Sequence, residues 1–240
     1  LAMASTWSTA RYLGLWCSLP LDFLAKVSGK SDVRDELLRA FPFPPPHPLD
    51  SALLLRTLRL NCLTADYAPL WEELYDPAWA DDAWTDPALT RVVLGDIGPA
   101  WTMATPLRRD QERRQALVEL DALAAIMLGL TAEQLCAMYR TQFAVLRKYE
   151  YAMVFDAEGR KICQHHQSAG FRQARLQEQA KAGDLPKEWA SVWKLVERWE
   201  EDPDSVDWAG RFTPPFTRVD REAEMTRAYQ AFTARLDTHP

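Results

Sequence analysis

The sequence predicts a mainly α-helical protein: an irregular multi-helix domain with one short β-hairpin near residues 151–163. Apolar residues recur at spacings of three and four along most of the chain, which is the pattern of core-facing helices. Proline, glycine and capping residues separate these stretches. A chain of 240 residues with 48% hydrophobic and 26% charged residues can bury a core and is typical of a globular protein.

The first 48 residues are expected to hold two short helices, a basic turn and a proline-rich connector. The pair Leu19-Pro20 is expected to break the first helix. The turn carries three cations, Lys26, Lys30 and Arg34. Proline cannot continue a helix, so the run from Pro42 to Pro48 is the best candidate for a domain boundary. We therefore divide the chain into residues 1–48 and a helical C-terminal domain, residues 49–240.

The next part of the chain combines helical spacing with a strong acidic bias. Residues 51–75 again show the helical pattern, whereas residues 76–106 are rich in proline, tryptophan and aspartate and are expected to be irregular. Residues 61–100 contain one arginine and eight acidic residues, a net charge of −7. Such a sector repels phosphate, so any contact with nucleic acid is expected on another face.

A pair of helices is expected over residues 107–128 and 131–150. Gly129 can adopt the left-handed conformation that ends a helix. Thr131 and Gln134 have the spacing of a capping box, which begins the next helix. This helix pair is expected to organise the fold.

Asp121 does not fit the apolar side of the first of these helices. Its neighbours at spacings of three and four are Leu117, Val118, Ala124 and Ala125. A buried carboxylate requires a cation or several hydrogen-bond donors. We therefore expect a structural ion pair of Asp121 with Arg140 or Arg147. A catalytic role for the carboxylate is the alternative.

The C-terminal part is expected to contain the hairpin and three more helices. A change to strand-like patterning around the turn from Asp156 to Gly159 predicts the hairpin. Helices are expected at about residues 171–182 and from Pro186, the second with a tryptophan-rich face over residues 189–199. The last helix carries an apolar stripe: Met225, Ala228, Tyr229, Phe232 and Leu236.

Few motifs in the sequence point to chemistry. Cys163, His165 and His166 could be metal ligands, but no fourth ligand lies at a suitable spacing. The sequence has no glycine-rich phosphate loop and none of the common hydrolase motifs. We therefore expect no catalytic residue, no metal site and no bound cofactor in this chain.

Two further motifs have a structural and a functional interpretation. The run Thr213-Pro214-Pro215-Phe216 resembles the loop with which amino-methylating DNA methyltransferases hold a flipped base. No apolar strand leads into it, so a proline stop before the last helix is the preferred interpretation. Four arginines between residues 108 and 114 form a second basic cluster, for which a solvated helix face with local ion pairs is preferred.

Cysteine use and hydropathy bear on the compartment. The four cysteines lie far apart without a CxxC pair, and no run of 18 apolar residues occurs. We expect free thiols in a reducing cytoplasm and no membrane partner. The opening residues do not resemble a signal peptide. They read like the middle of a helix, so we expect a piece of a longer polypeptide.

Two segments of the sequence carry a resemblance to a known group of enzymes. The first consists of Ser18 to Phe23 (SLPLDF), the basic turn from Lys26 to Arg34, and Phe41 to Pro44 (FPFP). The second consists of Glu119 to Ala122 (ELDA), Gly129-Leu130, and Thr141 to Phe143 with Arg147. The two segments resemble the C-terminal regions of large adenine-specific DNA methyltransferases, namely the type IIG restriction–modification enzymes and the methylases of BREX and DISARM phage-defence systems.

The resemblance implies that this chain is the DNA-recognition and helical scaffold portion of a site-specific adenine-N6 DNA methyltransferase. The catalytic domain, which binds S-adenosylmethionine, would lie outside this chain, because its motifs are missing here. Double-stranded DNA and the methyltransferase domain or subunit of the parent enzyme are the implied partners. Within this interpretation the residues expected nearest the duplex are Lys26, Lys30 and Arg34.

A second hypothesis needs no nucleic acid. The acidic sector of residues 61–100 and the tryptophan-rich helix could dock a partner subunit, which would make the chain a non-enzymatic helical interaction module. Large aromatic side chains such as Trp79, Trp84 and Trp199 would suit such an interface. An independent small enzyme is the third possibility, and no constellation of residues favours it.

Overall fold

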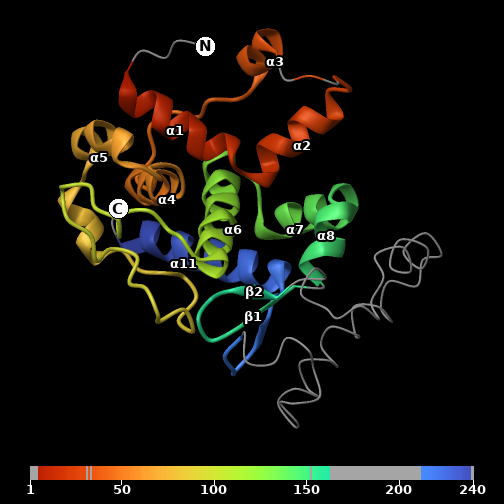
Figure 1. Ribbon diagram of the computed structural model, residues 1–240. Helices are drawn as coiled ribbons and strands as arrows, with labels where there is room; N and C mark the ends of the chain where they lie inside the picture. The colour runs from red at the N-terminus through yellow and green to blue at the C-terminus, as the bar shows by residue number, and fades with distance from the viewer. Residues whose placement is uncertain (1–4, 31, 33, 152, 163–211, 239–240) are drawn as a thin grey trace. The chain divides into compact units, whose positions relative to one another are not determined.

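A computed structural model describes residues 5–30, 32, 34–151, 153–162 and 212–238 of the chain (Figure 1). The helices expected at residues 171–182 and from Pro186 lie outside the described residues. The Cys163–His166 motif lies outside them as well.

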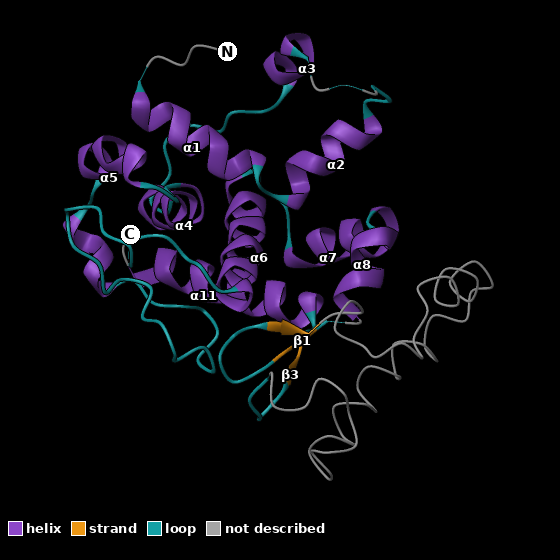
Figure 2. Ribbon diagram, in the orientation of Figure 1, coloured by secondary structure: helices purple, strands orange, loops and turns teal. Residues whose placement is uncertain are grey.

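The described residues form a mainly helical fold with a small antiparallel sheet, which confirms the predicted fold class (Figure 2). The helices are α1 (Thr6–Trp16), α2 (Leu19–Val27), α3 (Asp35–Ala40), α4 (Asp50–Asn61), η1 (Ala65–Tyr67), α5 (Ala68–Leu74), η2 (Pro77–Asp81), α6 (Asp110–Met127), α7 (Ala132–Gln142), α8 (Ala144–Tyr151) and α11 (Arg221–Thr238). The strands are β1 (Val154–Phe155), β2 (Lys161–Ile162) and β3 (Thr217–Arg218).

The chain divides into two compact units. Unit 1 comprises residues 1–108, 112–142 and 222–240, and unit 2 comprises residues 109–111 and 143–221. The boundary predicted between residues 48 and 49 lies inside unit 1, where α1 packs against α4. Gly14 permits this contact, because a Cβ atom at this position would overlap the hydroxyl oxygen of Thr57.

α4 lies at the centre of unit 1, and nearly all of its residues are buried, the charged ones included. Four of its side chains are completely buried: Leu53, Leu55, Arg56 and Thr57. The core cluster around one face of α4 also includes residues of α6 and α11, such as Leu120, Leu123 and Phe232. A second cluster on α4 includes Trp71 of α5 and Trp79 of η2. The core of unit 1 is therefore built from segments far apart in sequence.

The predicted start of α7 is confirmed in detail. The backbone N–H of Gln134 donates to the Thr131 hydroxyl at 3.1 Å, and the backbone N–H of Thr131 donates to the Gln134 side chain at 2.8 Å. Gly129 has the expected positive φ, 72°. The helix predicted over residues 131–150 is nevertheless two helices, α7 and α8, separated at the buried residue Phe143. No proline or glycine marks this break, so the sequence pattern did not reveal it.

The break of the first helix predicted at Leu19-Pro20 is confirmed, because α1 ends at Trp16, just before these residues. These residues begin α2, since proline lacks only an N–H that the first turn of a helix leaves unpaired anyway. The described residues between 5 and 41 therefore form three helices, α1, α2 and α3, instead of the two expected.

The sheet of unit 2 contains the predicted hairpin and one additional strand. β1 pairs antiparallel with β2, with Val154 opposite Ile162. β1 also pairs antiparallel with β3, with Val154 opposite Arg218. Gly159 takes a φ of 69° in the turn between β1 and β2. The two residues of β3 are exposed and carry no alternating pattern, so no local feature of the sequence indicates this strand.

The last helix, α11, is confirmed, with Met225, Ala228 and Phe232 completely buried. Over the described ranges, none of the helices has both the length and the apolar composition required to cross a bilayer.

Candidate functional site

The candidate DNA-contacting residues lie on a projecting part of unit 1, which we call the arm and define as residues 19–41. The arm consists of α2, a turn and α3. In Figure 1, α2 runs outward from the top of α6, and α3 lies at the margin, away from α4 and α11. Lys26, Lys30 and Arg34 are all exposed. The sequence-predicted residues are therefore brought to one accessible part of the molecule.

Asp121 holds the base of the arm. Its side chain is buried on α6, 1% exposed, and Oδ1 accepts a hydrogen bond of 2.7 Å from the backbone N–H of Leu19. Leu19 is the first residue of α2, and Ser18 before it provides no side-chain cap because its hydroxyl donates to the carbonyl oxygen of Leu15. Asp121 thus caps α2 from another helix, where the positive end of the helix dipole stabilises a carboxylate.

The thiol of Cys17 lies near the Asp121 carboxyl group. Burial raises the pKa of Cys17, and the Asp121 carboxylate raises it further. Asp121 therefore lies within an apolar wall with its side chain buried, as the sequence predicted.

The ion pair expected between Asp121 and Arg140 or Arg147 stays a prediction. Arg140 pairs with Glu133 at 2.5 Å and lies 3.5 Å from Glu222. Arg147 lies on α8, in unit 2. The sequence did not suggest the contact that Asp121 makes with the N-terminus of α2.

Side chains of α1 hold the far end of the arm. The Tyr12 hydroxyl donates to the carbonyl oxygen of Leu38 in α3 at 2.7 Å. The Arg11 guanidinium donates to the carbonyl oxygens of Pro44 and Pro45, both at 2.8 Å, and its Nε contacts Asp50 at 2.5 Å. Arg11 is completely buried. The proline-rich connector is therefore fastened to the core, and the arm is anchored at both ends.

The three predicted cations of the arm have different contacts. Lys26 Nζ donates to the carbonyl oxygen of Gln142, at the C-terminal end of α7, at 3.3 Å. Lys30 pairs with Glu36 at 3.4 Å, and Arg34 pairs with Asp32 at 3.1 Å. Lys26 therefore links α2 to α7, whereas Lys30 and Arg34 belong to solvent-exposed ion pairs.

The arm as a whole has no net charge. Residues 22–39 contain four basic and four acidic side chains. A third exposed pair joins Arg39 to Asp35 at 2.7 Å within α3. The arm is thus a mixed surface and not a uniformly positive one, which the predicted basic turn alone did not indicate.

The arginines of the second basic cluster, residues 108–114, mainly contact other residues of unit 1. Arg113 donates to the carbonyl oxygens of Leu60 and Leu107, and Arg114 pairs with Glu224 at 2.5 Å. Arg108 donates to the carbonyl oxygen of Met103. These contacts are structural, but the solvated helix face preferred from the sequence is wrong for two of the arginines, because Arg114 is buried and Arg113 is only partly exposed.

Part of the acidic sector is neutralised by arginines of the core. Asp82 pairs with Arg56 of α4 and with Arg235 of α11, each at 2.9 Å. Asp86 pairs with Arg227 at 3.0 Å. Asp82 and Asp86 therefore hold the loop after η2 against α4 and α11. Other acids of the sector are exposed: Asp66, Glu72, Glu73, Asp81 and Asp96.

The buried centre of this network is the pair of Arg56 and Glu119. Both side chains are completely buried, and Nε of Arg56 lies 2.5 Å from Glu119. Glu119 also accepts hydrogen bonds from the backbone N–H and the hydroxyl of Thr85, both at 2.7 Å. Burial opposes the charge of Arg56, but Glu119 and Asp82 outweigh this and raise its pKa. The pair is a structural element that joins α4 to α6.

Arg59, one turn after Arg56, is held without a carboxylate hydrogen bond. Its guanidinium donates to four backbone carbonyl oxygens, those of Val93, Leu94, Ala104 and Thr105. Burial lowers the pKa of Arg59 to about 10, an effect that Asp96 opposes. Arg59 remains charged at neutral pH and fixes the irregular loops around α4.

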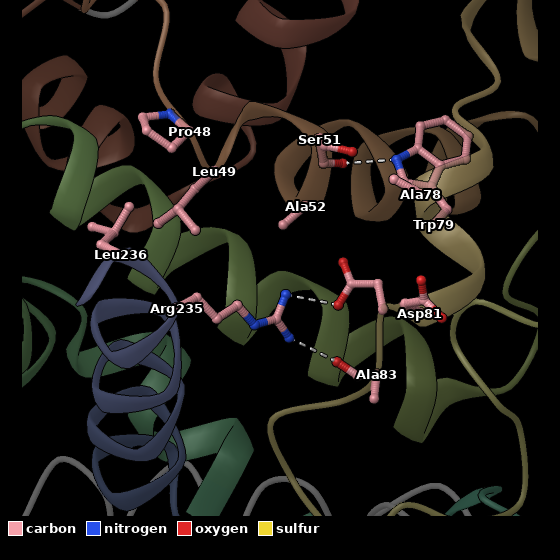
Figure 3. A pocket seen from close by; sticks show the side chains of 11 residues that line it. Pro48, Leu49, Ser51, Ala52, Ala78, Trp79, Asp81, Ala83, Arg235 and Leu236 are labelled. Atoms are coloured by element: carbon pink, nitrogen blue, oxygen red, sulfur yellow. Dashed lines mark hydrogen bonds and ion pairs between the residues drawn. The ribbon is translucent and has the colours of Figure 1, made fainter. Parts of the chain in front are cut away.

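A cavity of about 440 Å³ lies beside this network (Figure 3). Its walls come from the start of α4, from η2 and from the end of α11, where Arg235 reaches the carbonyl oxygen of Ala83. Most of the lining is apolar. Burial alone would raise the pKa of Asp82, but Arg56 and Arg235 lower it. Asp82 is therefore ionised at neutral pH and is not suited to be a general acid.

The aromatic residues of the acidic sector are largely internal. Trp79 is 1% exposed and packs against Trp71 and Tyr75. Trp84 is partly buried, and its Nε1 donates to the carbonyl oxygen of Val92 at 2.7 Å. Trp79 is therefore not available at the surface for a partner. Trp199 lies outside the described residues.

The Thr213–Phe216 run packs against the turn of the hairpin in unit 2. The backbone N–H of Ala157 donates to the carbonyl oxygen of Thr213 at 2.8 Å, and the backbone N–H of Thr213 donates to Asp156 at 3.1 Å. Phe216 is buried, 8% exposed. A buried ring cannot stack on a flipped base, so this run is a structural turn, as preferred from the sequence.

The described part of the chain thus belongs to the class of mainly α-helical proteins with buried arginine networks and an anchored, exposed arm. In comparisons with known proteins, no family model, curated protein or solved structure matches the chain.

Proposed function

We propose that this chain is the DNA-recognition and helical scaffold portion of a site-specific adenine-N6 DNA methyltransferase of restriction–modification or phage defence. In this proposal the arm lies against duplex DNA, and Lys30 and Arg34 contact its phosphates. Unit 1 holds the arm in position. Methyl transfer from S-adenosylmethionine takes place on a catalytic region outside this chain, which is the second partner.

One observation carries the proposal: the hydrogen bond between Asp121 and Leu19. The two segments that resemble the methyltransferases are about 100 residues apart in sequence, and each contains one of these two residues. Their contact supports the proposal because it joins the two segments, with Asp121 of the second segment capping α2 of the first. A structural role alone would account for the buried position of Asp121. It would not account for an anchored arm that carries exposed cations.

The contacts of the arm suit a part that must keep its position against a large ligand. Contacts to phosphate position a protein on the duplex, so the contacting side chains must be carried by a stable element. Asp121 holds the start of α2, and Lys26 links its end to α7. Tyr12 holds α3. We place the protein in the cytoplasm, where the free thiols of Cys17, Cys62 and Cys136 would stay reduced.

The affinity of the full 240-residue chain for duplex DNA tests this proposal. Phosphate contacts predict binding at low salt and a linear fall of the logarithm of the binding constant with the logarithm of the salt concentration. Fluorescence anisotropy with a labelled duplex of about 20 base pairs measures both. Absence of binding at low salt would contradict the proposal.

A protein-docking function is the second candidate. Specific support comes from residues 63–74, which include η1 and α5. Leu63 and Tyr67 are 42% and 44% exposed there, and Asp66, Glu72 and Glu73 are exposed acids of the same segment. Such a surface would suit a partner subunit with basic and apolar side chains. Light scattering of the chain alone and with the catalytic region of its parent tests this candidate, since a chain that ignores that region does not dock it. DNA binding distinguishes the two candidates, because the docking function alone predicts no affinity for the duplex.

A further inference from the structure

The exposed ion pairs of the arm have a consequence for DNA binding. Arg34 and Asp32 approach to 3.1 Å, and their side chains are 81% and 61% exposed. Lys30 and Glu36 approach to 3.4 Å, with side chains 53% and 85% exposed. The two cations at the tip of the arm are therefore occupied by acids of the same arm in the free protein.

We infer that Asp32 and Glu36 act as internal counter-charges that a DNA phosphate must displace, and that they limit the affinity of the arm for DNA. This inference rests on the proposed function. It identifies two acidic residues, and not only cations, as determinants of binding.

The exchange is possible because exposed ion pairs are weak. Such a pair contributes little net stability, since both side chains are well hydrated and mobile. Duplex DNA offers closely spaced negative charges and releases condensed counterions when a cation binds. Phosphate is thus the stronger partner for Lys30 and Arg34, and the carboxylates can be displaced.

Displacement does not remove the acids from the site. Asp32 and Glu36 stay within the same short turn and helix, so their charges remain close to the bound phosphates. Two like charges about 4 Å apart in water repel by an amount that corresponds to roughly a fivefold change in a binding constant. Salt screens this repulsion over a distance of about 10 Å at 0.1 M.

The other charged residues of the arm differ in their contacts. Lys26 donates to the carbonyl oxygen of Gln142, so it acts mainly by holding α2 against α7. Asp35 and Arg39 are spaced by four residues within α3, where such a pair stabilises the helix. The inference is therefore restricted to two ion pairs, Lys30 with Glu36 and Arg34 with Asp32.

A double variant, Asp32→Asn with Glu36→Gln, tests the inference in the full chain. Removing both charges is expected to tighten binding to a labelled duplex by roughly 5- to 25-fold at low salt, because each charge accounts for about fivefold. The gain is expected to shrink as salt rises. Both substitutions are at exposed positions, and circular dichroism and the melting temperature check that the fold is unchanged.

The matched control removes two acids elsewhere, Glu72→Gln with Glu73→Gln on α5. Both are exposed, and Figure 1 shows α5 away from α2 and α3. Binding is expected to change less than twofold. The inference is overturned if the wild type binds DNA and the arm variant stays within twofold of it, or if the α5 variant gains as much. If neither wild type nor arm variant binds DNA, the proposed function fails as well.

Discussion

Replacing Asp121 by alanine is expected to destabilise the protein and loosen the base of the arm. The substitution removes the acceptor for the backbone N–H of Leu19, which lies 2.7 Å from Oδ1. A buried donor left without a partner costs about 1–3 kcal/mol. The loss of a carboxylate at the N-terminal end of α2 adds about 1–2 kcal/mol in a buried position. We therefore expect a loss of about 3 kcal/mol in the free energy of unfolding.

Urea denaturation followed by circular dichroism measures this loss. A decrease of about 3 kcal/mol lowers the urea midpoint by roughly 1–2 M. Asp121→Asn keeps an acceptor oxygen in the same place and is expected to lose clearly less. Asp22→Ala, which removes an exposed carboxylate from the first turn of the same helix, is a matched control with an expected loss of about 0.5 kcal/mol. An Asp121→Ala midpoint equal to that of the wild type would refute the tertiary cap.

Three further substitutions test the core of unit 1. Glu119→Ala leaves the buried Arg56 with Asp82 as its remaining carboxylate partner and is expected to lower the free energy of unfolding, measured by urea denaturation, by about 3 kcal/mol. The exposed Glu72→Ala is expected to change it by almost nothing, and equal effects would contradict a buried pair. Gly14→Ala forces a Cβ atom into the neighbouring helix and is expected to cost about 1–3 kcal/mol, whereas Gly98→Ala, which meets no atom within 4 Å, is expected to be tolerated. The pKa of Asp82 is lowered in the folded state, so its stabilisation is present above the ordinary value of 3.8 and is lost as the pH falls through the lowered one. Asp82→Asn is therefore expected to lower stability at pH 7 and to flatten the decline between pH 5 and pH 2, and an unchanged decline would show that this carboxyl does not contribute.

The elements with strong local signals were predictable from the sequence. The capping box of Thr131 and Gln134, the stop at Gly129 and the apolar stripe of α11 all depend on residues close together in the chain. Local hydrogen bonds and periodicity determine such features. The hairpin was predictable for the same reason.

Features that depend on tertiary contacts were not predictable to the same extent. The sequence indicated that Asp121 is buried, but its contact with α2 depends on a residue about 100 positions away. β3 and the break between α7 and α8 have no local signal. The sequence suggested that the acidic sector repels phosphate or docks a partner subunit. Its ion pairs were not predictable, because the arginines that pair with its acids lie on helices outside the sector.

One missed signal was present in the sequence. Arg56 and Arg59 occur within the leucine-rich run of α4, where an exposed face for two arginines is hard to find. Charged residues inside an apolar helix indicate a buried polar network, since a buried charge requires partners. The partners themselves, Glu119 and the loop carbonyl oxygens, could be identified only from the fold.

The salt dependence of DNA binding by a charge-removal variant tests the role of the arm most directly. Each phosphate contact contributes roughly 0.9 to the slope of the logarithm of the binding constant against the logarithm of salt concentration. Lys30→Gln with Arg34→Gln is therefore expected to reduce the wild-type slope by about 1.8. Arg109→Gln, an exposed cation outside the arm, is expected to leave the slope nearly unchanged. Equal slopes for the wild type and the double variant would show that Lys30 and Arg34 do not contact phosphate.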